Sequence, residues 1–149
     1  MEKDPSETVT RAWARLMRAQ QGALSHIQAR LKAAGLPPLA WYDVMLEVER
    51  AGEPGLRPFE LERLMLLPQY GLSRLLERIE AAGYIHRWPS DDDGRGQIVT
   101  LTDSGRALRR RMWPVYAAAI NSGVGVHLSE DEAAALGELL GKLIPPPHN

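Results

Sequence analysis

The sequence predicts a mainly α-helical fold that contains a single two-stranded β-hairpin. Apolar residues recur at steps of three and four along most of the chain, which is typical of helices that bury one side. Residues 84–88 and 97–101 are instead short and rich in β-forming side chains. The segment between them contains Asp93-Gly94, a common hairpin connection. With 149 residues, the chain is long enough to form one domain, residues 1–149, with its own core.

Composition favours a folded soluble protein and restricts its chemistry. The formal net charge is −1 and cysteine is absent. Without cysteine, disulfides, thiolate zinc sites and thiol redox chemistry are excluded, and the chain is compatible with a reducing cytoplasm. The sequence has no signal-peptide pattern and no apolar run of bilayer-spanning length, so we expect a cytoplasmic location and no membrane association. Because the net charge is near zero, any nucleic-acid binding has to rely on locally placed arginines.

A long first helix is expected from about residue 5 to residue 35. Asp4 is the expected N-cap with Pro5 in the first turn, and Gly35 with the prolines after it ends the helix. One apolar stripe follows the helix: Val9, Trp13, Leu16, Leu24, Ile27 and Leu31. A stripe this narrow is typical of a helix that packs against other long helices, such as those of a second subunit. An ordinary core helix of the monomer is an equally good interpretation.

Three shorter helices should follow. The first runs from Leu39 to Arg50 and is capped at Gly52. The next starts at Pro58 and is broken by Pro68. Its expected buried side contains Phe59, Leu61, Leu64 and Met65. The last is predicted from Gln69 to Ala82, and its expected apolar side contains Leu72, Leu75, Leu76 and Ile79.

Two helices are predicted after the hairpin. Thr102 or Asp103 caps the first, which should be kinked at Pro114. Ser129 with Glu132 forms a capping box that starts the second. Two compact helices followed by a hairpin outline a winged helix-turn-helix at about residues 39–102, flanked by long helical segments at about 5–35 and 103–144.

The helix predicted at residues 69–82 is the candidate recognition element. A helix that enters the major groove needs polar side chains near its start and an apolar side that holds it on the domain. Four residues meet the first requirement: Gln69, Tyr70, Ser73 and Arg74. Arg78 and Arg87 are further cationic candidates, and Arg95 at the hairpin tip can enter a minor groove while Asp93 holds its guanidinium. The alternative is a solvated helix face and an ordinary turn, but the adjoining hairpin favours DNA binding.

A spaced set of residues resembles the signature of MarR-type transcriptional regulators. The set consists of residues 75–85, Arg87, Asp93-Gly94-Arg95 and residues 99–105. The resemblance covers about residues 39–108 and implies a homodimer with intertwined N- and C-terminal dimerisation helices, a recognition helix at 69–82 and a wing whose Asp93 orients Arg95 toward the minor groove of double-stranded DNA. It places Ser73 and Arg74 at groove-facing positions. The sequence departs from the family at residues 68–71, where small hydroxyl residues are common.

The same resemblance implies a small aromatic or anionic effector between the dimerisation helices and the DNA-binding part. Four residues are candidates for lining such a site: Trp13, His26, Trp41 and Tyr42. Each can equally be an ordinary core or interface residue, since aromatic side chains are frequent in both.

No enzymatic or metal-binding pattern is present, so we expect no cofactor. The four histidines, His26, His86, His127 and His148, are scattered, and residues 91–93 lack further oxygen ligands at calcium-site spacing. The resemblance to MarR-type regulators further implies a homodimeric repressor that binds a pseudo-palindromic operator and is released by a ligand, with half-sites roughly 34 to 36 Å apart. Two alternatives are a winged-helix module that binds a protein, favoured by the near-neutral charge and the acidic hairpin, and a small enzyme.

Overall fold

The computed structural model describes residues 2–89 and 96–146. Its elements are, in order, α1 (Glu7–Ala33), α2 (Leu39–Ala51), α3 (Pro58–Leu64), α4 (Leu72–Ala81), β1 (Ile85–Pro89), β2 (Gln97–Leu101), α5 (Asp103–Gly123), the 3-10 helix η1 (Gly125–His127) and α6 (Glu130–Gly141). This mainly helical architecture with one two-stranded antiparallel sheet confirms the predicted fold class. None of the helices in these two ranges is long and apolar enough to cross a bilayer.

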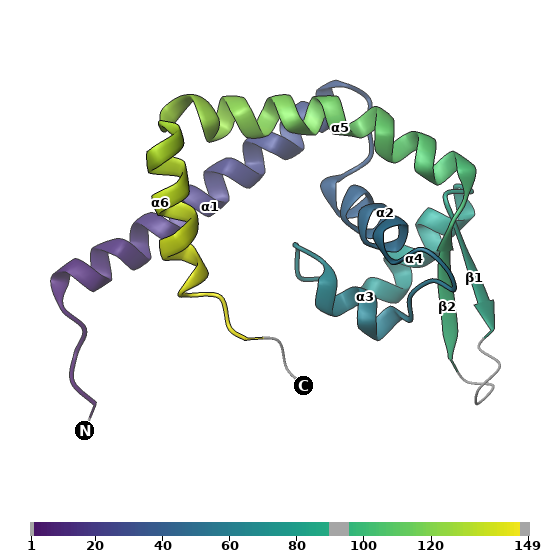
Figure 1. Ribbon diagram of the computed structural model, residues 1–149, viewed down its shortest axis with the longest axis horizontal. Helices are drawn as coiled ribbons and strands as arrows, with labels where there is room; N and C mark the ends of the chain where they lie inside the picture. Colours follow the sequence, from purple (N-terminus) through teal and green to yellow (C-terminus); the bar gives the residue numbers. More distant parts are fainter. Residues whose placement is uncertain (1, 90–95, 147–149) are drawn as a thin grey trace.

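The molecule has two parts, which Figure 1 shows side by side. Helices α2, α3 and α4 cluster beside the hairpin, and we call these elements, residues 39–101, the hairpin lobe. Helix α5 leaves the hairpin and runs along α1 to α6, and we call α1, α5 and α6 the helical arm. The two parts meet where α2 packs against α5.

The hairpin is extended by a short contact from the chain before α3. Strands β1 and β2 are antiparallel, with Ile85 opposite Leu101. Leu56 then forms a bridge to Val99, with amide-to-carbonyl distances of 3.0 and 2.7 Å in the two directions. Gly55 permits this approach, because its φ is +114° and a Cβ there would lie 2.4 Å from the carbonyl oxygen of Val99.

Helix α2 takes part in both apolar cores. Val44 and Val48 pack in the core of the hairpin lobe, together with residues of α3, α4 and both strands. Met45 and Leu39 pack in a second core with residues of α1 and α5. Burying one side chain of this size stabilises the fold by about 1.5 to 3 kcal/mol relative to exposing it. Helix α2 therefore joins the hairpin lobe to the helical arm.

Most predicted helix ends agree with the structure, but the start of α1 does not. Ser6, and not Asp4, is the N-cap, and its hydroxyl accepts a hydrogen bond from the amide of Val9 at 3.2 Å. Ser6 has the extended backbone of a cap residue, so Pro5 lies outside the helix. At the other helices the predicted caps Gly52, Thr102 and Ser129 are confirmed.

The predicted start of α4 at Gln69 was wrong, because the helix begins at Leu72. Gly71 is the N-cap, and its φ of −132° and ψ of 48° are not helical. Its carbonyl accepts the first helical hydrogen bond, from Leu75. Gln69 and Tyr70 therefore lie in the turn between α3 and α4, where Pro68 and Gly71 keep the chain from continuing as a helix.

The predicted buried side of α3 was also only partly right. Leu61 is fully buried, but Phe59 and Leu64 are exposed and Met65 is half-buried. The helix has only seven residues, about two turns, so few of its positions face the core. Arg63 instead covers the ring of Phe59, with its guanidinium carbon 5.8 Å from the ring centre.

The apolar stripe of α1 is mostly uncovered within the chain. Leu31 is buried, Leu16, Leu24 and Ile27 are half-buried, and Val9 and Trp13 are exposed, the latter by 62%. Helix α6 has no buried residue, and its Leu139 is 59% exposed. The far end of the arm thus presents large apolar side chains to solvent.

Candidate nucleic-acid interface

Helix α4 has a polar face directed away from the hairpin lobe. Leu75, Leu76 and Ile79 are buried in the lobe core, while Ser73 and Arg74 are exposed in the first turn of the helix. Arg78, also exposed, follows one turn later, and its Nε donates to the carbonyl of Arg74 at 3.4 Å. The exposed hydroxyl and guanidinium groups are donors for phosphate and base-edge acceptors.

The turn before α4 adds two of the predicted contact residues. Tyr70 is fully exposed, and Gln69 is half-buried. Together with Glu62, Met65 and Pro68 they line a shallow depression of about 300 Å³. The two residues therefore precede the N-terminus of α4 and do not lie on its polar face.

Arg87 is held within the chain by Glu80. Its Nη2 and Nε donate to Glu80 Oε1 at 2.9 and 3.1 Å, and its backbone amide donates to Oε2 at 2.7 Å. These hydrogen bonds from Arg87 hold the pKa of Glu80 below its usual value. Because its guanidinium binds Glu80, Arg87 links β1 to α4. A DNA contact by Arg87 stays a prediction.

The predicted pair at the wing tip, Asp93 and Arg95, lies outside the described residues. Its role in minor-groove binding stays a prediction.

The four predicted effector-site residues do not come together in the chain. Trp13 is exposed on the first half of α1, and His26 lies on the second half, 2.6 Å from the hydroxyl of Ser122 on α5. Trp41 contacts the edge of the Tyr84 ring, at a centroid distance of 6.2 Å. Tyr42 is buried beside Trp113 and Tyr116.

A depression of about 380 Å³ lies beside Tyr42. Its lining comes from α2, from the chain just after α3 and from α5, and includes Asp43, Leu66 and Tyr116. Asp43 is buried, and its Oδ2 accepts the amide of Leu67 at 2.9 Å. Burial raises the pKa of Asp43, and backbone hydrogen bonds from Leu67 and Leu66 oppose the rise. Sequence reasoning missed this residue, although an aspartate inside the apolar run 41–46 was a visible signal.

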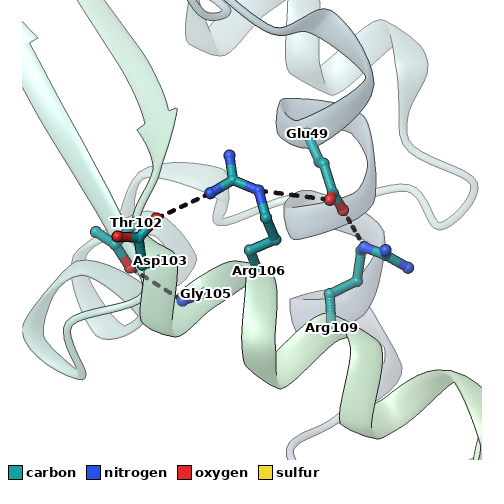
Figure 2. Close-up of polar contacts among 6 residues, drawn as sticks. All are labelled: Glu49, Thr102, Asp103, Gly105, Arg106 and Arg109. Atoms are coloured by element: carbon teal, nitrogen blue, oxygen red, sulfur yellow. Dashed lines mark hydrogen bonds and ion pairs between the residues drawn. The ribbon is translucent and has the colours of Figure 1, made fainter.

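A network of charged side chains joins α2 to α5 at the junction of lobe and arm. Figure 2 shows Glu49 of α2 between two arginines of α5. Glu49 Oε2 accepts a hydrogen bond from Arg109, and Glu49 Oε1 lies 3.6 Å from Arg106 Nε. Arg106 also pairs with Asp103 at 3.1 Å. Burial lowers the pKa of Arg109, because it disfavours the charged form. Hydrogen bonds to Glu49 and Tyr42 favour the charged form more strongly, so the pKa of Arg109 is raised overall.

Comparisons with known proteins agree with this geometry. A model of the MarR family matches residues 34–96. The multiple antibiotic resistance protein MarR of Escherichia coli is 31% identical over 88 residues, which span 59% of this chain and 61% of that protein. An HTH-type transcriptional regulator of Bacillus cereus is 33% identical over 131 residues, which span 88% of this chain and 85% of the relative.

Solved structures show the same fold. Sco3205 of Streptomyces coelicolor, a MarR family transcriptional regulator crystallised in complex with DNA, superposes with a TM-score of 0.85 at 23% identity, over 96% of this chain and 89% of that one. A mutant of Escherichia coli MarR complexed with operator DNA gives a TM-score of 0.79 at 23% identity, over 96% of this chain and 100% of the other.

The helix-turn-helix geometry, the family model and a relative aligned over most of both chains lead to the same assignment. Members of this family are regulators of transcription and not enzymes. The chain belongs to the MarR family of transcriptional regulators.

Proposed function

We propose that this protein binds double-stranded DNA as a homodimer, with one α4 in the major groove of each half-site. The observation that carries the proposal is the two-sided character of α4, whose leucine and isoleucine side chains are buried while Ser73, Arg74 and Arg78 are exposed. Tyr70 and Gln69 reach the DNA from the turn before the helix, and Arg95, oriented by Asp93, enters the minor groove. The DNA complexes of the structural neighbours support this arrangement.

The exposed apolar side chains of the arm support the homodimer. Val9, Trp13 and Met17 on α1 and Leu136 and Leu139 on α6 are all exposed in the single chain. Apolar surface of this extent at the end of an arm is typical of a subunit interface. The sequence left a second subunit and the monomer core open for the stripe on α1. Its exposed part, Val9 and Trp13, is proposed to face the second subunit, whereas Leu24, Ile27 and Leu31 pack in the core of the single chain.

We further propose that the protein is a cytoplasmic repressor whose operator binding is relieved by a small aromatic effector. The depression beside Tyr42 supports this, because its lining comes from α2, from the turn that leads to α4 and from α5. A ligand there contacts both the lobe and the arm. The lining contains the carboxyl groups of Asp43 and Glu47 and one cation, Arg50, which is already paired with Glu47. No unpaired cation in this lining attracts an anion, so an aromatic effector is favoured over an anionic one.

The experiment is a titration of the purified protein with its own upstream promoter DNA and with random DNA, at two salt concentrations. Tight binding should weaken with a slope of log K against log salt of about −0.9 per phosphate contact. Arg74→Ala should reduce promoter affinity about 5- to 150-fold, the equivalent of about 1 to 3 kcal/mol for a lost base contact. Arg30→Ala, an exposed arginine in the last turn of α1, is the matched control and should have little effect. Equal binding to promoter and random DNA would refute the proposal.

One observation favours a second candidate function, a module that binds a protein. Phe59 and Leu64 on α3, with Leu66 and Tyr70 in the turn after it, are large and exposed. An apolar patch of this kind suits a protein partner. Salt decides between the two functions, because binding through such a patch would change little between the two salt concentrations.

A further inference from the structure

The contact between lobe and arm determines where α4 sits relative to the dimerisation end of the chain. Helices α2 and α4 contribute side chains to the same core of the hairpin lobe. A close-packed core resists deformation, so the lobe is treated as one unit. Helix α5 leads from the hairpin to α6, along the arm. The angle between α2 and α5 therefore determines the position of α4 relative to the second subunit.

A small change in this angle has a large effect at the DNA. Helix α5 contains 21 residues, so it is about 30 Å long at a rise of about 1.5 Å per residue. A rotation of about 10° between α2 and α5 shifts one end relative to the other by about 5 Å. This exceeds the spacing of about 3.4 Å between neighbouring nucleotides of one strand. A loose junction would thus let the two α4 helices bind half-sites at several spacings.

The charged network of Figure 2 is built to restrain this angle. Glu49 lies on the last turns of α2, while Arg106 and Arg109 lie on consecutive turns of α5. The side chains of Glu49 and Arg109 are only 22% and 18% exposed, so solvent screens their attraction less than it would at the surface. Two arginines that approach one carboxylate from successive turns fix both the rotation and the position of α2 along α5.

We propose that Glu49 is a positioning residue which, through Arg109 and Arg106, sets the spacing of the two recognition helices and so the half-site spacing that the dimer accepts. The inference rests on the proposed DNA-binding function. Glu49 itself does not touch the DNA in this proposal, and the affinity of one lobe for one half-site does not depend on it.

A glutamate within the hairpin lobe provides the control. Glu60 lies on α3, and it is also half-buried. Its Oε1, however, accepts the backbone amide of Arg57 at 3.0 Å, a contact that stays within the lobe and does not cross to the arm. Glu60→Gln removes a carboxylate of the lobe, keeps an acceptor oxygen for this amide and leaves the junction intact.

The test measures binding to a series of DNA duplexes whose half-sites are moved apart or together in steps of one base pair, together with a duplex containing one half-site. Glu49→Gln should reduce the preference for the best spacing over its neighbours about 3-fold or more, within the range by which single residues modulate coupling between sites. Single half-site affinity and the dimer dissociation constant should stay unchanged. Glu60→Gln should keep the wild-type spacing preference.

An unchanged spacing preference in folded Glu49→Gln would overturn the inference and assign the angle to the apolar contacts of Leu39, Met45 and Leu108 at the same junction. If Glu49→Gln does not fold, Arg106→Gln replaces it, because this variant removes the longer and more exposed of the two contacts. A reduced spacing preference in Arg106→Gln then supports the inference, and an unchanged preference overturns it. If wild type itself shows no preference for promoter DNA, the proposed function fails before the spacing series begins, so the two failures are distinguishable.

Discussion

Arg87 on β1 and Glu80 on α4 form a contact in which one carboxylate accepts hydrogen bonds from both the guanidinium and the backbone amide of the same arginine. The side chains are only 18% and 30% exposed. Because the backbone amide takes part, the contact fixes the strand itself and not only its side chain. The hairpin is thereby held at a defined distance from α4.

Loss of this contact should destabilise the fold more than loss of a surface ion pair. Arg87→Ala should lower the free energy of unfolding by about 1 to 2 kcal/mol, since it removes hydrogen bonds to a charged group in a half-buried place. Arg11→Ala is the control, because its pair with Glu7 is largely exposed and should contribute less than about 0.5 kcal/mol. Urea unfolding measures both, and equal losses would contradict the interpretation.

The same pair should make stability depend on pH. Hydrogen bonds from Arg87 lower the pKa of Glu80 in the folded state below its usual 4.5. The stabilisation is therefore complete above pH 4.5 and is lost as pH falls through the lower folded pKa. The difference in unfolding free energy between wild type and Glu80→Gln should be largest near pH 7 and shrink below pH 4.5. A difference that stays constant across this range would show that ionisation of Glu80 does not matter.

Asp43 should show the opposite pH dependence. Burial raises its folded pKa above the usual 3.8, so its contribution is greatest when it is protonated and declines as pH rises through the folded pKa. Wild type should therefore lose stability relative to Asp43→Asn as pH increases from about 3 to 7. The measurement is again urea unfolding, and a gain over that range would contradict the burial argument.

Asp43 also acts as an acceptor for the turn before α4. Asp43→Ala leaves the amide of Leu67 without its partner and should cost about 1 to 3 kcal/mol. Asp43→Asn keeps one acceptor oxygen and should cost less at pH 7. Thermal unfolding of both variants compares them, and an alanine variant as stable as the asparagine variant would mean that solvent replaces the acceptor.

Gly105 is required by the packing of α5 against the chain before β1. A Cβ at this position would lie 2.1 Å from the carbonyl oxygen of Tyr84 and 2.6 Å from Leu101. Gly105→Ala should therefore destabilise the fold by about 1 to 3 kcal/mol. Gly22→Ala, in the middle of α1 with no atom near its Cβ position, should instead stabilise by about 0.5 to 1 kcal/mol. The opposite signs are checked by thermal unfolding at one protein concentration.

Local patterns in the sequence were sufficient for most elements. The glycine that ends α2, the threonine that caps α5 and the capping box of Ser129 and Glu132 all act within a few residues of the chain. The two strands were also predicted to within one residue, because their composition and the turn between them are local signals. The start of α4 was misplaced because amphipathic spacing continues back through Gln69, whereas the backbone at Gly71 is not helical.

For the candidate interface, the sequence by itself determined that Ser73, Arg74 and Arg78 lie on α4 opposite the leucines, because helical spacing separates the two sets. It also placed Gln69 and Tyr70 on this helix, and only the structure moved them into the turn before it. Only the tertiary structure decided that Arg87 is bound to Glu80 and that Glu49 meets Arg109 sixty residues away. The spacing of apolar residues along a helix or strand indicates which side chains are polar, but it contains no information about their partners. Their pairing depends on how whole helices and strands pack against each other. That packing is set by the two apolar cores that share α2, and no local run of residues contains both cores.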